Sequence, residues 1–151
     1  MKIVLGSDHG GYEYKEMLRN HLLSLGINVI DVGTFSKESC NYAYFAIEAA
    51  KKVASKECEL GILICNSGEG VAIAANKVKG VRCGIGYNDE VAHLIREHNN
   101  ANMISFGAHF TSYEDVEKRV DIFINSSFLG ERHKVRVDTI SDFENDNSIS
   151  K

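Results

Sequence analysis

One stretch, residues 60–77, most constrains how this chain can fold. It begins with an uninterrupted apolar run at 60–65, in which no polar residues alternate with the apolar ones. Such a run is typical of a parallel strand that is buried on both faces of a sheet. A polar turn with a serine and two glycines follows at 66–70, and small residues at 71–75 favour a helix packed closely on that sheet. The stretch therefore predicts a strand, a turn and a helix, the repeating unit of an α/β fold.

The same order of strand and helix recurs along the chain. Apolar runs predict further strands at 2–7, 27–32, 81–86 and 102–107, and apolar stripes at spacings of three and four predict helices at 14–25, 42–53, 91–98 and 113–127. A last helix is expected to begin near Glu131. The connections are long enough for parallel pairing. We therefore predict one domain over residues 1–151: a Rossmann-like, doubly wound α/β sheet of about five parallel strands with helices on both faces, plus a C-terminal helix and a tail that is frayed from about residue 145.

Composition excludes several classes of function. The net charge of −4 argues against a nucleic-acid groove. The first residues reach a charged side chain too soon for a secretory signal, and no apolar run is long enough for a membrane span, so we expect a cytoplasmic protein with no membrane partner. The four cysteines, at 40, 58, 65 and 83, have no C-x-x-C spacing. Neither a zinc knuckle nor a redox dithiol is therefore expected.

Cys65 ends the apolar run of the central stretch, at the position where open α/β sheets bind their ligands. A strand that enters a helix through such a turn leaves amide N–H groups unpaired, and these can hold a carbonyl oxygen or an anion. The positive end of the helix dipole is expected to favour the thiolate form of Cys65. The alternative is a buried core cysteine, but a purely structural turn seldom needs two glycines and a hydroxyl together.

Two further groups of polar residues are expected at the same place. Asp8 and His9 follow the first predicted strand, and His98 and Asn99 end the helix before the fifth. Because the carboxyl ends of parallel strands share one edge, we predict that these side chains converge with Cys65 on one cleft. Each has a structural alternative. Asp8 could simply cap the following helix, and His98 could be a histidine favoured by the C-terminal end of the helix dipole.

Arg132 and Arg136 lie four residues apart in the last predicted helix and share one face. Two guanidinium groups on one face suit a phosphate, although a solvated charged face is the simpler alternative. The chain contains neither a complete dinucleotide fingerprint nor a G-x-x-x-x-G-K-[ST] motif, so no nucleotide cofactor is expected. Asp8, His9 and His98 do not form a tight cluster of ligands, so no metal is expected either.

A set of motifs runs in order through nearly the whole chain. They are Asp8-His9-Gly10-Gly11, Gly33-Thr34, Tyr42, the run from Ile64 to Gly70, Ala74-Ala75-Asn76-Lys77, Gly80-Val81-Arg82, His98-Asn99-Asn100-Ala101-Asn102, Phe106-Gly107 and Arg132-His133-x-x-Arg136. Together they resemble the type B ribose-5-phosphate isomerases, which belong to a sugar-phosphate isomerase family that also holds galactose-6-phosphate and allose-6-phosphate isomerases. The resemblance implies interconversion of ribose 5-phosphate and ribulose 5-phosphate through an enediolate, in the pentose phosphate pathway, without metal or cofactor. It also implies a homodimer or a dimer of dimers with sites at the subunit interface.

The resemblance implies roles for individual residues as well. Cys65 is expected to move the proton between carbons 1 and 2, His98 to open the furanose ring, and Ser67 to polarise the oxygens or to carry a proton between them. The expected substrate-binding residues are Asp8 and Asn99 for hydroxyls, His9, Arg132 and Arg136 for phosphate, the turn of Asn66, Ser67, Gly68, Glu69 and Gly70, and in addition Tyr42 and His109. His109 stands where the family commonly has an arginine that binds phosphate.

Three alternatives to this function remain open at the level of the sequence. The loop around 36–42 could admit a longer sugar, as in a hexose-6-phosphate isomerase. Cys65 and His98 could instead be the nucleophile and base of a thiol hydrolase. A flavodoxin-like binding module without enzymatic activity would need neither residue.

Overall fold

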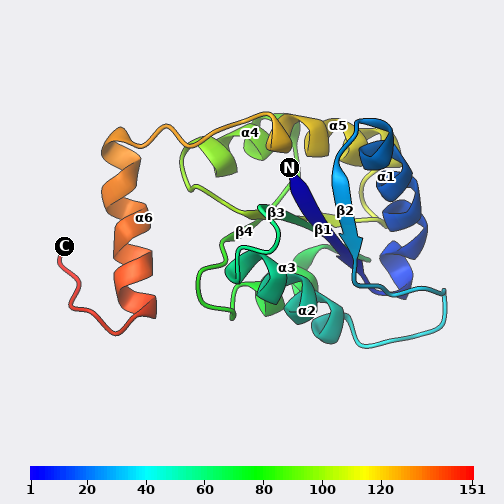
Figure 1. Cartoon of the computed structure of the whole chain (residues 1–151), viewed down its shortest axis with the longest axis horizontal. Coiled ribbons are helices and arrows are strands. Elements are labelled where there is room, and N and C mark those ends of the chain that lie inside the picture. The colour runs from blue at the N-terminus through cyan, green and yellow to red at the C-terminus, as the bar shows by residue number, and fades with distance from the viewer.

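Five strands form one parallel sheet in the order β2-β1-β3-β5-β4, in a computed structural model that describes residues 1–151 (Figure 1). The strands are β1 Lys2–Ser7, β2 Asn28–Asp31, β3 Leu60–Cys65, β4 Cys83–Ile85 and β5 Met103–Gly107. Every neighbouring pair is parallel. The order reverses direction between β1 and β3, so the sheet is doubly wound, as the sequence predicts.

Helices cover both faces of this sheet. They are α1 Tyr12–Ser24, α2 Tyr42–Ala54, α3 Glu69–Ala75, α4 Asp89–Glu97, α5 Tyr113–Ile124 and α6 Glu131–Glu144, with a short 3-10 helix at His9–Gly11. In Figure 1, α1, α4 and α5 lie on one side of the sheet, and α2 and α3 lie on the other. None of the helices combines the length and the apolar character needed to span a lipid bilayer.

Alternate residues of the central strand supply two separate cores. Ile62 and Ile64 pack with α1, α4 and α5, whereas Leu63 and Cys65 pack with α2 and α3. All six residues of β3 are buried. The absence of polar alternation in this strand therefore has a direct cause, because each of its side chains enters one core or the other.

Several elements are shorter than their apolar runs predict. β4 covers three residues instead of six. At its start, the Arg82 N–H donates to the side-chain oxygen of Asn102, 2.9 Å away, and at its end the Tyr87 N–H turns back to the carbonyl of Ile85. Helix α5 ends at Ile124, three residues before the predicted boundary, where the Asn125 N–H closes the last turn on Asp121.

The last helix, α6, stands apart from the rest of the chain and leads to the C-terminus (Figure 1). Only His133 and Val137, four residues apart on one face, are buried in it. Val135 and Phe143 are 70% and 71% exposed. A helix that buries so little within its own chain presents apolar side chains for which this chain offers no partner.

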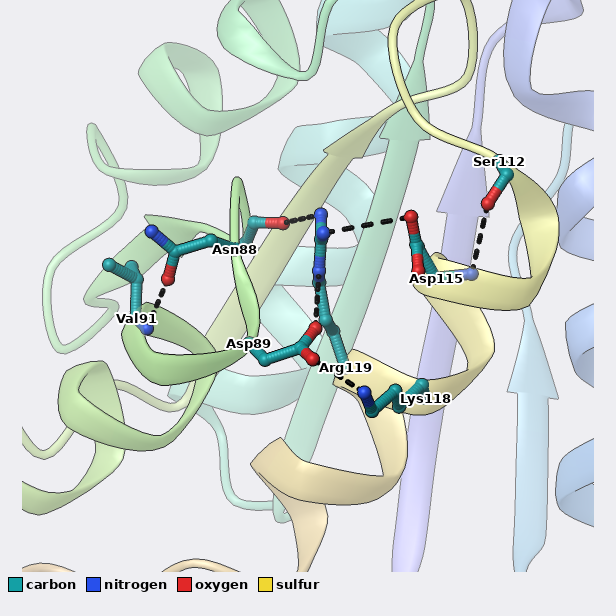
Figure 2. Close-up of polar contacts among 8 residues, drawn as sticks. Asn88, Asp89, Val91, Ser112, Asp115, Lys118 and Arg119 are labelled. Carbon is teal, nitrogen blue, oxygen red and sulfur yellow. Dashed lines mark hydrogen bonds and ion pairs between the residues drawn. The ribbon is translucent and has the colours of Figure 1, made fainter.

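Arg119 joins the end of β4 to the helices that follow it (Figure 2). Its guanidinium donates to the Gly86 carbonyl at 3.1 Å and to the Asp89 carboxylate at 3.0 Å. Lys118 also contacts Asp89, at 2.6 Å. These two hydrogen-bonded cations hold the pKa of the Asp89 carboxyl below its usual value. The first turn of α4 is thereby tied to the middle of α5.

Candidate active site

Asp8 and Asn66, which follow β1 and β3, meet at the carboxyl edge of the sheet. The Asp8 N–H donates to the Ile64 carbonyl at 3.3 Å, and the Asp8 carboxylate accepts from the Gly11 N–H at 3.1 Å. Asp8 therefore caps the 3-10 helix that follows it, which confirms the structural alternative given for this residue in the sequence analysis. A methyl group on Gly10 would lie 3.3 Å from the Asp8 carboxylate and 3.4 Å from the Asn66 nitrogen. The turns after β1 and β3 are therefore in contact, because these two strands are neighbours in the parallel sheet.

The thiol of Cys65 lies just inside this edge. The side chain is 5% exposed, and its sulfur accepts a hydrogen bond from the Gly68 N–H at 3.1 Å. The next amide, of Glu69, donates to the Ser67 hydroxyl at 3.2 Å. The amides of Gly70 and Val71 form no hydrogen bond within the chain. The turn thus provides a sulfur that already accepts one N–H donor, followed by two unbonded N–H groups at the start of α3, of which that of the partly exposed Gly70 can reach a ligand and that of Val71 is buried.

The shape of the turn at 66–70 depends on β5. Gly68 has φ +81°, and a methyl group on it would lie 2.8 Å from the Phe106 carbonyl carbon. The buried Ser105 hydroxyl donates to the Gly68 carbonyl at 2.9 Å. After β5, the His109 N–H donates to the Asn66 carbonyl at 3.0 Å. Only glycine fits this approach, and the same contacts bring His109 to the turn.

His9 and Tyr42 complete the part of the edge that one chain provides. The His9 Nδ1 accepts from the Cys40 N–H at 3.3 Å, so that in the neutral ring the proton is on Nε2, which remains free to donate. The Tyr42 ring packs over Gly70, where a methyl group would lie 2.7 Å from a ring carbon. Most of the predicted site residues are therefore gathered at one edge: Asp8, His9, Tyr42, Cys65, Asn66, Ser67, Gly68, Glu69, Gly70 and His109.

His98 and Asn99 are not at this edge, so the predicted convergence with Cys65 inside one chain is wrong. His98 caps the C-terminal end of α4, with its N–H donating to the Leu94 carbonyl at 2.8 Å. The chain then enters β5 at Met103, which pairs with Gly61 near the start of β3. Because a helix that leads into a parallel strand must end at the amino end of that strand, His98 lies toward the opposite edge from Cys65.

Arg132 and Arg136 are on α6, both with exposed side chains, and they lie near His98 instead of Cys65. The link is His133, whose ring stacks on that of His98 with a centroid distance of 4.1 Å and an interplanar angle of 11°. Burial lowers the pKa of His133, and the neighbouring His98, Arg132 and Arg136 lower it further. The candidate residues of one chain therefore form two groups, one around Cys65 and one around His98.

A groove of about 740 Å³ runs beside β4 between these two groups. Glu69 lies at one end, and His98 and Asn99 lie at the other. The residues between them come from β4, from the turn after it and from α4: Cys83, Ile85, Tyr87, Val91, Leu94 and Ile95. β4 is an edge strand of the sheet. An apolar groove along an edge strand suits another protein surface better than a sugar.

Two buried side chains had no structural role predicted from the sequence, although His133 belongs to one of the motifs given above. His133 is buried next to the two arginines, and its spacing of four from Val137 marks the inward face of α6. Lys15 is completely buried in α1, with Nζ 2.5 Å from the Asp31 carboxylate. The other carboxylate oxygen of Asp31 accepts from the Gly33 N–H at 2.9 Å. The spacing of Lys15 from Leu18 and Leu22 would have placed it on the apolar stripe of that helix.

Two other cysteines, Cys58 and Cys83, have thiols that burial makes less acidic. Burial raises the pKa of Cys58, and it raises the pKa of Cys83 to about 12, so neither thiol ionises readily at neutral pH. The structure contains no group of three or more His, Cys, Asp or Glu side chains placed to hold a metal ion.

Comparison with known proteins identifies the family. The profile of the Ribose/Galactose Isomerase family matches residues 3–140. The chain belongs to the ribose/galactose isomerase family. Within this family it is 38% identical over 143 residues to ribose-5-phosphate isomerase B of Escherichia coli strain K12, covering 95% of this chain and 96% of that protein.

Solved structures of family members have the same fold. Ribose-5-phosphate isomerase B of Clostridium thermocellum superposes with a TM-score of 0.95 at 41% identity, covering 98% of this chain and all of that one. The Mycoplasma genitalium enzyme, solved with bound ribulose-5-phosphate, gives a TM-score of 0.94 at 37% identity and covers 97% of each chain. The match thus extends over the complete sheet and the helices around it, as the sequence motifs indicate.

Proposed function

We propose that this chain is an aldose–ketose isomerase that interconverts ribose 5-phosphate and ribulose 5-phosphate. The observation that carries the proposal is the match over nearly the whole length to proteins named ribose-5-phosphate isomerase B, one of them solved with ribulose-5-phosphate bound. The Cys65 turn, with its sulfur, hydroxyl and free amides, supports the proposal independently. A role in the pentose phosphate pathway and a cytoplasmic location, both expected from the sequence, belong to the same proposal.

Cys65 is the base that we assign to the isomerisation. Its thiolate removes the proton from carbon 2 of the open-chain aldose, a double bond forms between carbons 1 and 2, and the carbonyl oxygen on carbon 1 becomes an enediolate oxygen. Return of that proton to carbon 1, with loss of the proton from the oxygen on carbon 2, gives the ketose. The free amide of Gly70 supports stabilisation of the charged oxygen, and Ser67 carries the proton between the two oxygens.

Several of the remaining roles need a second copy of the chain, because their residues lie in the group around His98. We assign ring opening to His98, hydroxyl binding to Asp8 and Asn99, and phosphate binding to His9, His109, Arg132 and Arg136. In one chain the group around His98 is separated from the group around Cys65, with an apolar groove beside β4 between them. The exposed Val135 and Phe143 of α6 also need a partner surface. A homodimer, or a dimer of dimers, that brings His98 of one copy to Cys65 of another accounts for these features together.

The six-carbon alternative and the thiol hydrolase are less well supported. The relatives reported above are named for ribose 5-phosphate, and a hydrolase finds no support among them. Because the family name also includes galactose, the choice between a five-carbon and a six-carbon substrate requires an assay that compares the sugar phosphates directly.

The test is a coupled assay of the purified protein with chelator present. We expect turnover of ribose 5-phosphate well above that of allose 6-phosphate or galactose 6-phosphate, and exchange of the hydrogen on carbon 2 with solvent. Cys65→Ala is expected to abolish turnover but to retain binding of the sugar phosphate. Cys58→Ala, which removes a buried thiol just before the amino end of β3, at the opposite end of that strand from Cys65, is the matched control. Full activity of Cys65→Ala, or turnover restricted to hexose phosphates, would refute the proposal.

A further inference from the structure

A pocket of about 330 Å³ at the amino edge of the sheet has no role in the proposed isomerisation. Its charged side chains are Lys56, Arg82, Arg96 and Glu59, and Met1, whose terminal ammonium lies 3.8 Å from the Glu59 carboxylate, also lines it. Asn100 and Ser126 add polar groups to the lining. None of the residues assigned above to the sugar phosphate lines this pocket. A concave surface with an excess of positive charge attracts anions.

The two arginines are held in place by backbone carbonyls. Arg82 donates to the Asn99 and Asn100 carbonyls, both at 2.9 Å. Arg96 donates to the Ala101 carbonyl at 2.6 Å and to the Ser126 carbonyl at 3.4 Å. No carboxylate lies within 4.0 Å of either guanidinium, in a chain where Arg119 has two carboxylate partners. Each guanidinium has five N–H donors and uses two of them here.

Two half-buried cations so close together are costly without a counter-charge. Burial lowers the pKa of both guanidiniums, and the charge of Arg82 further lowers the pKa of Arg96. The more distant Glu144 carboxylate raises the pKa of Arg82, against the effect of burial, and the Arg96 guanidinium carbon lies 5.6 Å from the centroid of the Phe123 ring, but neither guanidinium forms an ion pair. An anion that accepts from the unused N–H groups of both arginines would supply the missing charge.

We propose that this pocket binds a small phosphate-type anion between Arg82 and Arg96, with Lys56 at its rim. The anion is separate from the phosphate of the proposed substrate. Because both arginines hold the turn at 99–101, directly after His98, an anion here also restrains the segment that carries His98. The pocket is therefore a second anion site, coupled through backbone hydrogen bonds to the turn beside the proposed active site.

The experiment measures binding of inorganic phosphate by calorimetry in the double variant Arg132→Gln/Arg136→Gln, which lacks the arginines proposed for the substrate phosphate. We expect the double variant to retain one phosphate site for each chain. Adding Lys56→Gln should weaken that site about fivefold, and adding Glu59→Gln should tighten it by a similar factor. A second titration with ribose 5-phosphate distinguishes free phosphate from a phosphate that is part of a sugar. A pocket that accepts whole sugar phosphates binds both ribose 5-phosphate and inorganic phosphate.

Two controls remove the same charges from exposed positions that do not line the pocket. Lys79→Gln and Glu38→Gln should leave phosphate binding unchanged. The proposal is overturned if the double variant binds no phosphate, or if Lys56→Gln and Lys79→Gln have equal effects. Neither outcome depends on isomerase activity, so this test can fail while the proposed function stands.

Discussion

The imidazole rings of His98 and His133 stack in parallel, with centroids 4.1 Å apart and an interplanar angle of 11°. This contact joins the C-terminal end of α4 to the start of α6. The Leu129 N–H, which donates to the Glu97 carbonyl at 3.0 Å, holds the connecting segment beside it. His133 Nε2 is buried without a hydrogen-bond partner. A proton on His133 would place a charge in this stack, near two arginines, so the fold keeps His133 neutral.

His133→Phe tests that statement through the pH dependence of stability. Because the folded pKa of His133 lies below the ordinary value of 6.5, the unfolded chain takes up a proton before the folded chain does as the pH falls. Stability from this group is complete above pH 6.5 and decreases below it. We expect the urea midpoint of the parent protein to fall more between pH 7.5 and 5.5 than that of His133→Phe, which retains a stacked ring but does not titrate. If the urea midpoints of the two proteins decreased equally at the same protein concentration, a neutral His133 would be contradicted. An NMR titration of the His133 ring with a pKa above 6.5 would contradict it as well.

Gly68→Ala and Gly80→Ala form a matched pair that separates backbone strain from steric contact. Both glycines have a positive φ, +81° and +85°. Around Gly80 a methyl group meets nothing within 4 Å, whereas at Gly68 it would lie 2.8 Å and 2.9 Å from backbone atoms of β5. We expect Gly80→Ala to cost about 1 kcal/mol of unfolding free energy and Gly68→Ala about 3 kcal/mol. Denaturant melts measure both, and equal costs would mean that the turn can move away from β5.

The sequence predicts most of the fold because the signals that define it are local. The unbroken apolar run of β3, the turn after it and the small residues of α3 are consecutive, and the structure preserves them in that order. The capping of the first turn by Asp8 is local as well. The place of His98 is different. A helix that precedes a parallel strand ends at the amino end of that strand, so the predicted order of elements already implies that His98 lies opposite Cys65. The predicted convergence failed because it treated the end of this helix as if it were the carboxyl end of a strand.

Lys15 shows a second limit of the sequence, since a charged residue in an apolar stripe gives no sign of its partner. One partner is the adjacent Glu16, with an oxygen 2.7 Å from Nζ, and the other is Asp31, at the end of β2, whose contact with Gly33 holds the loop that leads away from that strand. Asp31 is distant in the sequence, and only the pairing of β1 with β2 brings it near α1. The prediction of α1 from its apolar stripe is nevertheless correct, because the other inward positions of the stripe are leucines.

Lys15→Met is expected to destabilise the protein by about 3 kcal/mol, since it leaves the largely buried Asp31 carboxylate without its cation, whereas Glu16 is more exposed to solvent. The double variant Lys15→Met/Asp31→Asn should recover part of this loss, because asparagine is neutral and its oxygen still accepts from the Gly33 N–H. Denaturant melts of the two single variants and the double variant measure the coupling. If the two losses add, the ion pair contributes nothing beyond its separate side chains.

The proposed division of the site between two copies makes a prediction that a single-chain site cannot meet. Cys65→Ala and His98→Asn should each be inactive alone, yet mixing the two proteins under conditions of subunit exchange should restore activity. In a hybrid dimer one site carries both substitutions and the other carries neither, so random assortment gives about a quarter of the parent activity. Cys65→Ala mixed with Ser67→Ala is the control, since both residues lie on the same turn and each site of that hybrid keeps one defect. If Cys65 and His98 of one chain served the same site, every site in the mixture of Cys65→Ala and His98→Asn would remain defective, and no activity would return. Restored activity therefore shows directly that His98 of one chain serves the site of the other.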